Sequence, residues 1–225
     1  KWKTAENWPA PQTKTADIYL AGEGWAQTSA GDGRLVFERP ERECADAYDY
    51  DPENPAVHII DMSENEIEVP EDYTEEEKRQ DMLCYTSEIL DRDITITGDM
   101  TAELYISSDA PDTDFIVRVT DVDEKGRSIK LADGILSARY RNGFEKSEFL
   151  TKDEIVCLKI RTTKISNCFK KGHRIRVTVT SGAKNLVFPN SNTKDGYNST
   201  TYVVARNKVY HGGSHASRLT VRVED

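Results

Sequence analysis

Short segments in which apolar and polar residues alternate recur along most of this chain. In residues 102–106, 115–119 and 174–180, every second residue is apolar. Because successive side chains of a β-strand point to opposite faces of a sheet, each segment is predicted to be a strand with one buried face. Turns such as Lys125-Gly126 and Lys171-Gly172 separate the segments, and helical spacing of apolar residues is scarce. The pattern predicts an all-β fold built as an antiparallel sandwich.

Negative charge is concentrated in one part of the chain. The formal net charge is −10, which argues against nucleic acid or an anionic membrane as the main partner. Residues 61–81 contain ten Asp or Glu against two basic residues, Lys78 and Arg79, and so carry −8 of that charge. We expect this acidic insertion to be a solvated loop with a short helix over residues 74–82. An acidic docking surface is the alternative.

A series of short motifs resembles one protein family. Residues 81–87 (DMLCYTS), 93–98 (DITITG) and 107–115 (SSDAPDTDF) follow one another as in the C-terminal domain of the cocaine-esterase / Xaa-Pro dipeptidyl-peptidase family of serine hydrolases. Further motifs that resemble the family, in the same order, lie at residues 8–9, 48–55, 138–141, 169–176, 189–193 and 209–211. The resemblance therefore covers essentially the whole chain.

This resemblance implies a jelly-roll β-sandwich, galactose-binding-domain-like, that accompanies an α/β-hydrolase catalytic domain. Residues 1–225 would form a single C-terminal domain with an irregular wrapping segment (1–55), the acidic insertion (61–81) and the main sandwich (82–225). The catalytic domain, with its Ser, Asp and His, is absent from this chain. We expect the domain to pack on that catalytic domain of the same parent chain, to help shape the substrate pocket and to offer a contact for a homo-oligomer.

Five aromatic residues are candidates for the contact with the catalytic domain. They lie in the first quarter of the chain, where the resemblance places the exit from the catalytic domain: Trp2, Trp8, Trp25, Tyr48 and Tyr50. The alternative is that they are core or rim aromatics of this domain alone.

Catalysis by this chain alone is not expected. The nearest match to the Gly-x-Ser-x-Gly nucleophile elbow is residues 212–216, GGSHA. A strand pattern follows this segment, and too few residues remain after it to supply an acid and a base. Ser214 and His215 are adjacent on an extended chain and would point to opposite sides. A hairpin loop is the better interpretation, with no catalytic residue and no cofactor.

Three neighbouring carboxylates leave one question open. Asp109, Asp112 and Asp114 could hold a cation, but a Pro-containing turn with Asx caps accounts for them equally well. Residues 121–126 begin like a calcium loop but lack its later ligands. We therefore assign no metal ligand.

The four cysteines, Cys44, Cys84, Cys157 and Cys168, lack metal-ligand spacing and are expected to be free thiols in a reducing, cytoplasmic setting. No apolar run approaches the roughly 18 residues of a membrane span, and Lys1 does not open a signal-peptide pattern.

The leading hypothesis for function is a non-catalytic accessory domain of a serine hydrolase, either a dipeptidyl-peptidase or an acyl esterase. It predicts a broad exposed apolar patch where the catalytic domain would pack. A freestanding carbohydrate-binding jelly roll is the alternative, and it predicts an exposed aromatic platform with polar neighbours.

Overall fold

A computed structural model describes residues 4, 6–9, 12–59 and 71–224 of the chain. These residues form 13 strands and three short 3-10 helices. The first strands and the first helix are β1 (Thr13–Ala21), β2 (Arg34–Val36), β3 (Cys44–Tyr50), η1 (Glu76–Lys78), β4 (Met82–Ser87), β5 (Ile94–Gly98), β6 (Thr101–Ser108) and β7 (Asp114–Val122). They are followed by β8 (Ser128–Ser137), η2 (Ala138–Tyr140), β9 (Val156–Arg161), β10 (Ile165–Phe169), β11 (Arg174–Thr180), η3 (Gly196–Asn198), β12 (Ala205–His211) and β13 (Arg218–Glu224).

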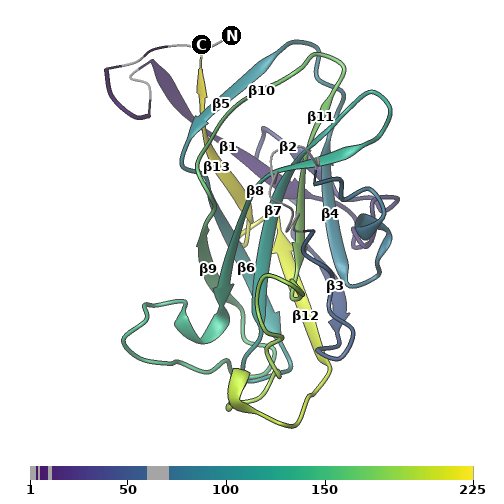
Figure 1. Cartoon of the computed structure of the whole chain (residues 1–225), viewed down its shortest axis with the longest axis vertical. Coiled ribbons are helices and arrows are strands. Elements are labelled where there is room, and N and C mark those ends of the chain that lie inside the picture. The colour runs from purple at the N-terminus through teal and green to yellow at the C-terminus, as the bar shows by residue number, and fades with distance from the viewer. Residues whose placement is uncertain (1–3, 5, 10–11, 60–70, 225) are drawn as a thin grey trace, which may run out of the picture.

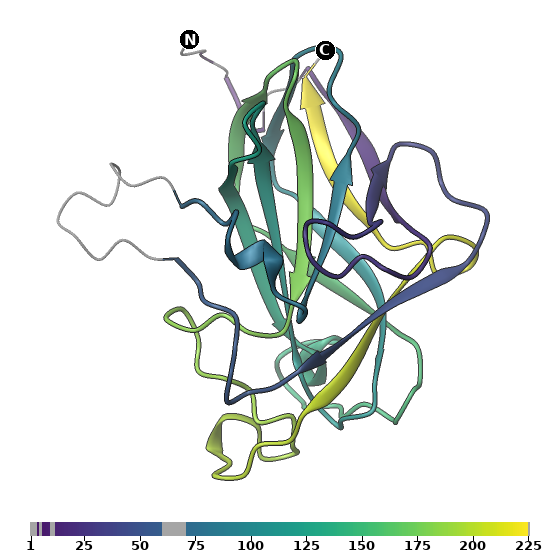
Figure 2. The ribbon, with the colours of Figure 1, turned by 90° about the vertical axis from the view of Figure 1, so that its right-hand side faces the viewer.

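Ten of the 13 strands follow one hydrogen-bonded path, β3-β12-β6-β13-β1-β2-β4-β11-β7-β8, which folds into two facing layers (Figures 1 and 2). Off this path, β5 pairs with β10 and β13. One layer is β2-β4-β11-β7-β8, and β9 pairs with β6 in the other. Every pairing is antiparallel except the short parallel contact of β2 with β4. At one edge the layers approach closely: a Cβ added to Gly134 of β8 would lie 2.3 Å from the carbonyl oxygen of Arg161 in β9.

The hydrophobic core lies between the layers and follows the alternation seen in the sequence. Val177 of β11 stands opposite Tyr85 of β4 and Val119 of β7, and all three side chains are fully buried. Paired residues of neighbouring strands share a face, so one apolar row extends across three strands. The predicted all-β jelly-roll sandwich is confirmed.

The N-terminal part of the chain adds strands to the sheet. β1 pairs with β13 over seven residues, which places Thr13 beside Glu224 at one end of the molecule. β2 pairs with β1 and β4, and β3 pairs with β12 along its whole length.

Residues 71–81, the described part of the acidic insertion, cross the outer face of the layer that contains β4 and β11. η1 is the short helix expected here. The expectation of a solvated face is wrong for Glu77, which is 0% exposed. Its carboxylate pairs with Arg176 of β11 and accepts a hydrogen bond of 2.6 Å from Ser128 of β8. The ion pair and the hydrogen bond compensate the desolvation of the buried charge.

Candidate functional site

Two buried carboxylates, Asp112 and Asp114, hold together the loops at one end of the sandwich. Arg139 donates to Asp112 from its backbone nitrogen (3.0 Å) and from Nε (2.7 Å). Asn190 Nδ2 lies between the two carboxylates, at 2.6 Å from Asp112 and 2.9 Å from Asp114. Tyr197 donates its hydroxyl to Asp114 at 2.6 Å. Burial raises the pKa of Asp114 above its ordinary value, and these hydrogen bonds oppose the shift.

The third carboxylate of the acidic turn, Asp109, accepts a hydrogen bond from the backbone nitrogen of Arg206 at 2.8 Å. Protein donors therefore occupy all three carboxylates. Among the described residues, no three His, Cys, Asp or Glu side chains form a group that could hold a metal ion. The geometry favours the interpretation of these residues as turn and loop anchors.

Exposed apolar side chains gather on the two loops that this network fastens. The loops, residues 138–155 and 181–204, lie at the end of the sandwich opposite Thr13 and Glu224 (Figure 1). We call their exposed apolar side chains the loop-end surface: Phe144, Phe149, Leu186, Phe188, Tyr197, Tyr202, Val203 and Val204. It contains eight of the twelve large exposed hydrophobic residues among those described. Exposed apolar side chains that gather at one end of a domain are candidates for an interaction surface.

Contacts within this surface join the two loops. Lys194 Nζ lies 5.6 Å from the ring centroid of Phe149, so a cation of the second loop covers an aromatic ring of the first. Lys194 also lines a shallow pocket of about 360 Å³ together with Val203, Val204 and Pro111. The apolar residues are therefore held on a fixed support.

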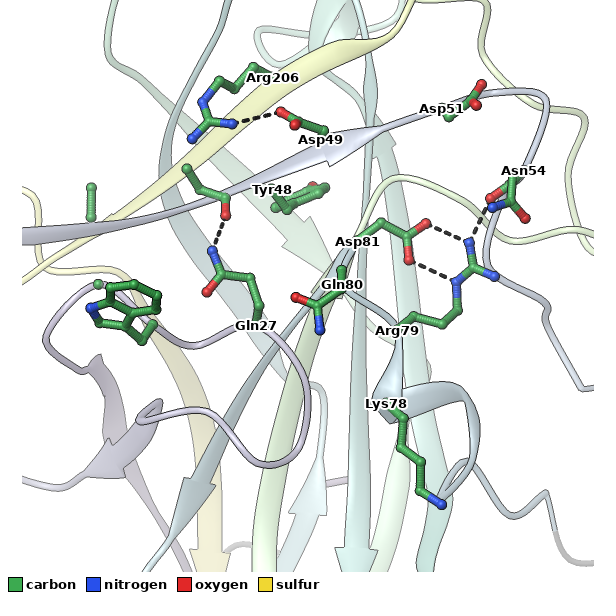
Figure 3. Close-up of a pocket in the computed structure, with 14 residues that line it drawn as sticks. Gln27, Tyr48, Asp49, Asp51, Asn54, Lys78, Arg79, Gln80, Asp81 and Arg206 are labelled. Atoms are coloured by element: carbon green, nitrogen blue, oxygen red, sulfur yellow. Dashed lines mark hydrogen bonds and ion pairs between the residues drawn. The ribbon is translucent and has the colours of Figure 1, made fainter.

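A second candidate site is an open pocket of about 880 Å³ beside β3 (Figure 3). Residues 24–27, β3 and residues 78–81 supply most of its walls. Arg79 donates to both carboxylate oxygens of Asp81, at 2.7 and 2.8 Å, and to the carbonyl of Asn54 (Figure 3). Trp25 lines the pocket and is 73% exposed. Two ion pairs, Arg79–Asp81 and Arg206–Asp49, thus lie within the walls, and the indole of Trp25 is an exposed apolar group beside them.

The loop that carries Trp25 is anchored in the core by Asp46. Asp46 Oδ1 accepts from the backbone nitrogen of Ala26 at 2.9 Å. Its Oδ2 accepts from the hydroxyl of Tyr85 at 2.8 Å and lies 2.9 Å from Nε2 of His211. This buried anchor joins residues from four parts of the chain, and no local sequence signal indicated it.

The five aromatic interface candidates separate into different groups. Tyr48 and Tyr50 are 2% and 0% exposed, and the Tyr48 hydroxyl lies 2.7 Å from Ser181 Oγ. Their side chains are core residues of this domain, because the inward face of β3 carries them into the sandwich. Trp8 and Trp25 are exposed. Trp2 lies outside the described residues.

The Gly212–Ala216 segment lies in the connection between β12 and β13. The prediction of a hairpin is wrong, because both strands pair antiparallel with β6 and not with each other. Glu43 Oε2 accepts from the backbone nitrogen of Ser214 at 3.2 Å and lies 3.1 Å from His215 Nδ1. His215 is therefore oriented by Glu43, and it does not face Ser214 as a general base.

A family model for the X-Pro dipeptidyl-peptidase C-terminal non-catalytic domain matches residues 1–220. This chain belongs to that family. The family domain is non-catalytic, and Ser214 lies in a loop between two strands and not on a strand-to-helix nucleophile elbow. All four cysteines are free, as predicted. Among the described residues, none of the helices has the length and the hydrophobicity of a membrane span.

Several known proteins contain a region similar to this family domain. The cocaine esterase of Rhodococcus sp. (strain MB1 Bresler) is 34% identical over 235 residues, which cover 99% of this chain and 40% of the esterase. The structure of an aminopeptidase from a marine sediment Thaumarchaeota archaeon has a TM-score of 0.89 at 23% identity. The match covers 100% of this chain and 39% of the aminopeptidase chain. The structure of an α-amino acid ester hydrolase has a TM-score of 0.82 at 21% identity, and the match covers 99% of this chain and 38% of the hydrolase chain. The chain thus spans about two fifths of the length of these proteins, and the two structures bear on the fold alone.

Sequence reasoning missed most of the loop-end surface. Phe144 stands singly among polar and small residues, and Phe188 ends the three-residue apolar run Leu186-Val187-Phe188, so neither belongs to a periodic apolar pattern. The sequence signal that could have indicated this surface is the length of the two connections, residues 138–155 and 181–204, because long loops often carry functional residues.

Proposed function

We propose that this chain is the C-terminal accessory domain of a serine hydrolase and that it packs on an α/β-hydrolase domain of the same parent chain through the loop-end surface. The observation that carries this proposal is the gathering of eight exposed hydrophobic residues on two loops that a buried hydrogen-bond network fixes in place. A freestanding module would expose this apolar area to water, whereas a covering domain would remove it from solvent.

For the parent protein we propose carboxylic-ester hydrolysis as the activity. A cocaine esterase is 34% identical to this chain, whereas the similar aminopeptidase structure is 23% identical. The domain would contribute binding surface and shape to the substrate pocket and no reacting group. The free cysteines support a reducing, cytoplasmic location for the parent.

The test uses two forms of the protein, this chain alone and the longer parent. Phe144→Asp and Phe188→Asp together should leave the Tm of the chain alone unchanged, because both side chains are exposed there. In the parent the same pair should lower the Tm and the rate of p-nitrophenyl ester hydrolysis, because a charge would be buried at the contact. Phe37→Asp, another exposed phenylalanine outside the loop-end surface, is the matched control.

Docking through this surface would be contradicted if the parent with the two Phe→Asp changes kept its Tm and hydrolysis rate. It would also be contradicted if Phe37→Asp lowered both quantities by the same amount. A concentration-dependent loss of oligomer with intact hydrolysis would instead assign the surface to a homo-oligomer contact. Parallel assays with an Xaa-Pro-p-nitroanilide separate the esterase from the dipeptidyl-peptidase.

A further inference from the structure

Arg118, in the middle of β7, is 0% exposed and is the largest fully buried side chain among the described residues. None of its three guanidinium nitrogens has a hydrogen-bond partner among those residues. It lies on the outer face of its layer, because its neighbours Val117 and Val119 point into the core.

A buried guanidinium is unfavourable unless an acceptor receives hydrogen bonds from its N–H groups. Burial lowers the pKa of Arg118, but an arginine does not give up its charge within a protein. A buried charge needs both a counter-charge and hydrogen-bond acceptors. The ring of Tyr73 stacks on the guanidinium, with Cζ 3.7 Å from the ring centroid. A ring face stabilises the cation, but it leaves the in-plane N–H groups without acceptors.

The neighbouring carboxylates already bind other donors. Asp133 stands opposite Arg118 on β8, and its Oδ2 lies 2.8 Å from His58 Nε2 and 3.4 Å from Lys130 Nζ. Glu77 pairs with Arg176. The hydrogen bonds and ion pairs of these two carboxylates thus go to other side chains and not to Arg118.

Three further buried polar atoms in this region also lack a hydrogen-bond partner among the described residues, and one of them, Glu71 Oε2, forms an ion pair with Lys130. Thr178 stands opposite Arg118 on β11, and its Oγ1 has no hydrogen-bond partner. His58 Nδ1 also has no hydrogen-bond partner. The His58 and Tyr73 rings pack edge to face, with their centroids 6.3 Å apart. Cross-strand neighbours on one face have their Cβ atoms about 5 Å apart, so the Thr178 hydroxyl and the guanidinium can reach one ligand.

We propose that Arg118 and Thr178 bind a small monovalent anion of the halide class beneath residues 71–77. The guanidinium supplies the charge and several N–H donors, and the hydroxyl supplies one more. A multivalent anion would bring more negative charge than one buried guanidinium offsets, so a chloride-like ion is favoured over phosphate or sulfate. This site is independent of the contact with a catalytic domain.

Bromide replaces chloride and can be located by its anomalous scattering, so crystals of this chain soaked in sodium bromide test the site directly. We expect an anomalous peak within hydrogen-bonding reach of the Arg118 nitrogens and Thr178 Oγ1. Density for water alone, or an acidic side chain of the chain itself at that position, would overturn the proposal.

A solution measurement avoids dependence on crystals. Ligands that bind the native state raise the Tm, so the Tm should be higher in sodium chloride than in sodium gluconate of equal ionic strength. Thr178→Val, which keeps the shape of the side chain, should reduce this difference, and Arg118→Met should abolish it if the variant folds. Arg206→Met, at an exposed arginine, should retain it. The same chloride effect in the wild type, Thr178→Val and Arg206→Met, or no chloride effect in the wild type, would refute the site.

Discussion

Glu77 and Arg176 form a buried ion pair that fastens the described part of the acidic insertion to β11. Glu77 belongs to a segment whose next residues, 78–81, line the pocket beside β3. One charge pair thus supports a wall of that pocket.

Removal of one partner of this pair should be strongly destabilising. We expect Glu77→Gln to lower the free energy of unfolding by about 3 kcal/mol, because it leaves Arg176 buried without a counter-charge. Glu77→Gln combined with Arg176→Met should cost less than the sum of the two single changes. Urea denaturation of all four proteins completes the cycle, and simple additivity would show that the pair is not coupled.

The carboxylate of Asp46 should control the order of the Trp25 loop. Asp46→Asn is expected to cost about 2 kcal/mol, because the buried amide of Ala26 and the Tyr85 hydroxyl lose a charged acceptor. Hydrogen exchange at the Ala26 amide should become faster. Asp49→Asn, at an exposed carboxylate of the same strand, is the control. Unchanged protection of Ala26 in Asp46→Asn would contradict the anchor.

The stability of the domain should depend on pH through Asp114. Burial raises the folded-state pKa of Asp114 above its ordinary value of 3.8. The folded state then binds a proton more tightly than the unfolded state, so this group's contribution to the free energy of unfolding falls as pH rises from 3.8 through the folded-state pKa. Asp114→Asn should remove that slope in urea titrations between about pH 4 and pH 7. If the free energy of unfolding depended on pH equally in the wild type and in Asp114→Asn, Asp114 would be excluded as the source of the slope.

Asn190 should be essential for the support of the loop-end surface. Its amide donates to both Asp112 and Asp114, and hydrogen bonds to charged groups contribute roughly 1.5–3 kcal/mol each. We therefore expect Asn190→Ala to lower the free energy of unfolding by at least about 2 kcal/mol and to increase proteolysis within residues 181–204. Asn198→Ala, an exposed change in the same loop, serves for comparison. A similar protease sensitivity of the two variants would rule out this role.

The strand pattern and the family resemblance were accessible from the sequence because they depend on local order. Alternation in residues 174–180 correctly predicted that Ile175, Val177 and Val179 face the core. The same pattern predicted that Arg176 and Thr178 face outward, which is correct, but they are not solvated. The period of two assigns each side chain to a face, and it carries no information on what covers that face.

The sequence alone determined the all-β class, the family and the absence of a nucleophile elbow, since each depends on residues close together in the chain. The tertiary structure alone decided which polar residues are buried. Asp46 meets His211 and Glu77 meets Arg176 across separations of 165 and 99 residues. It also placed the exposed phenylalanines of two distant loops at one end of the sandwich. Such contacts arise from strand order and loop path, which alternation along the chain does not encode.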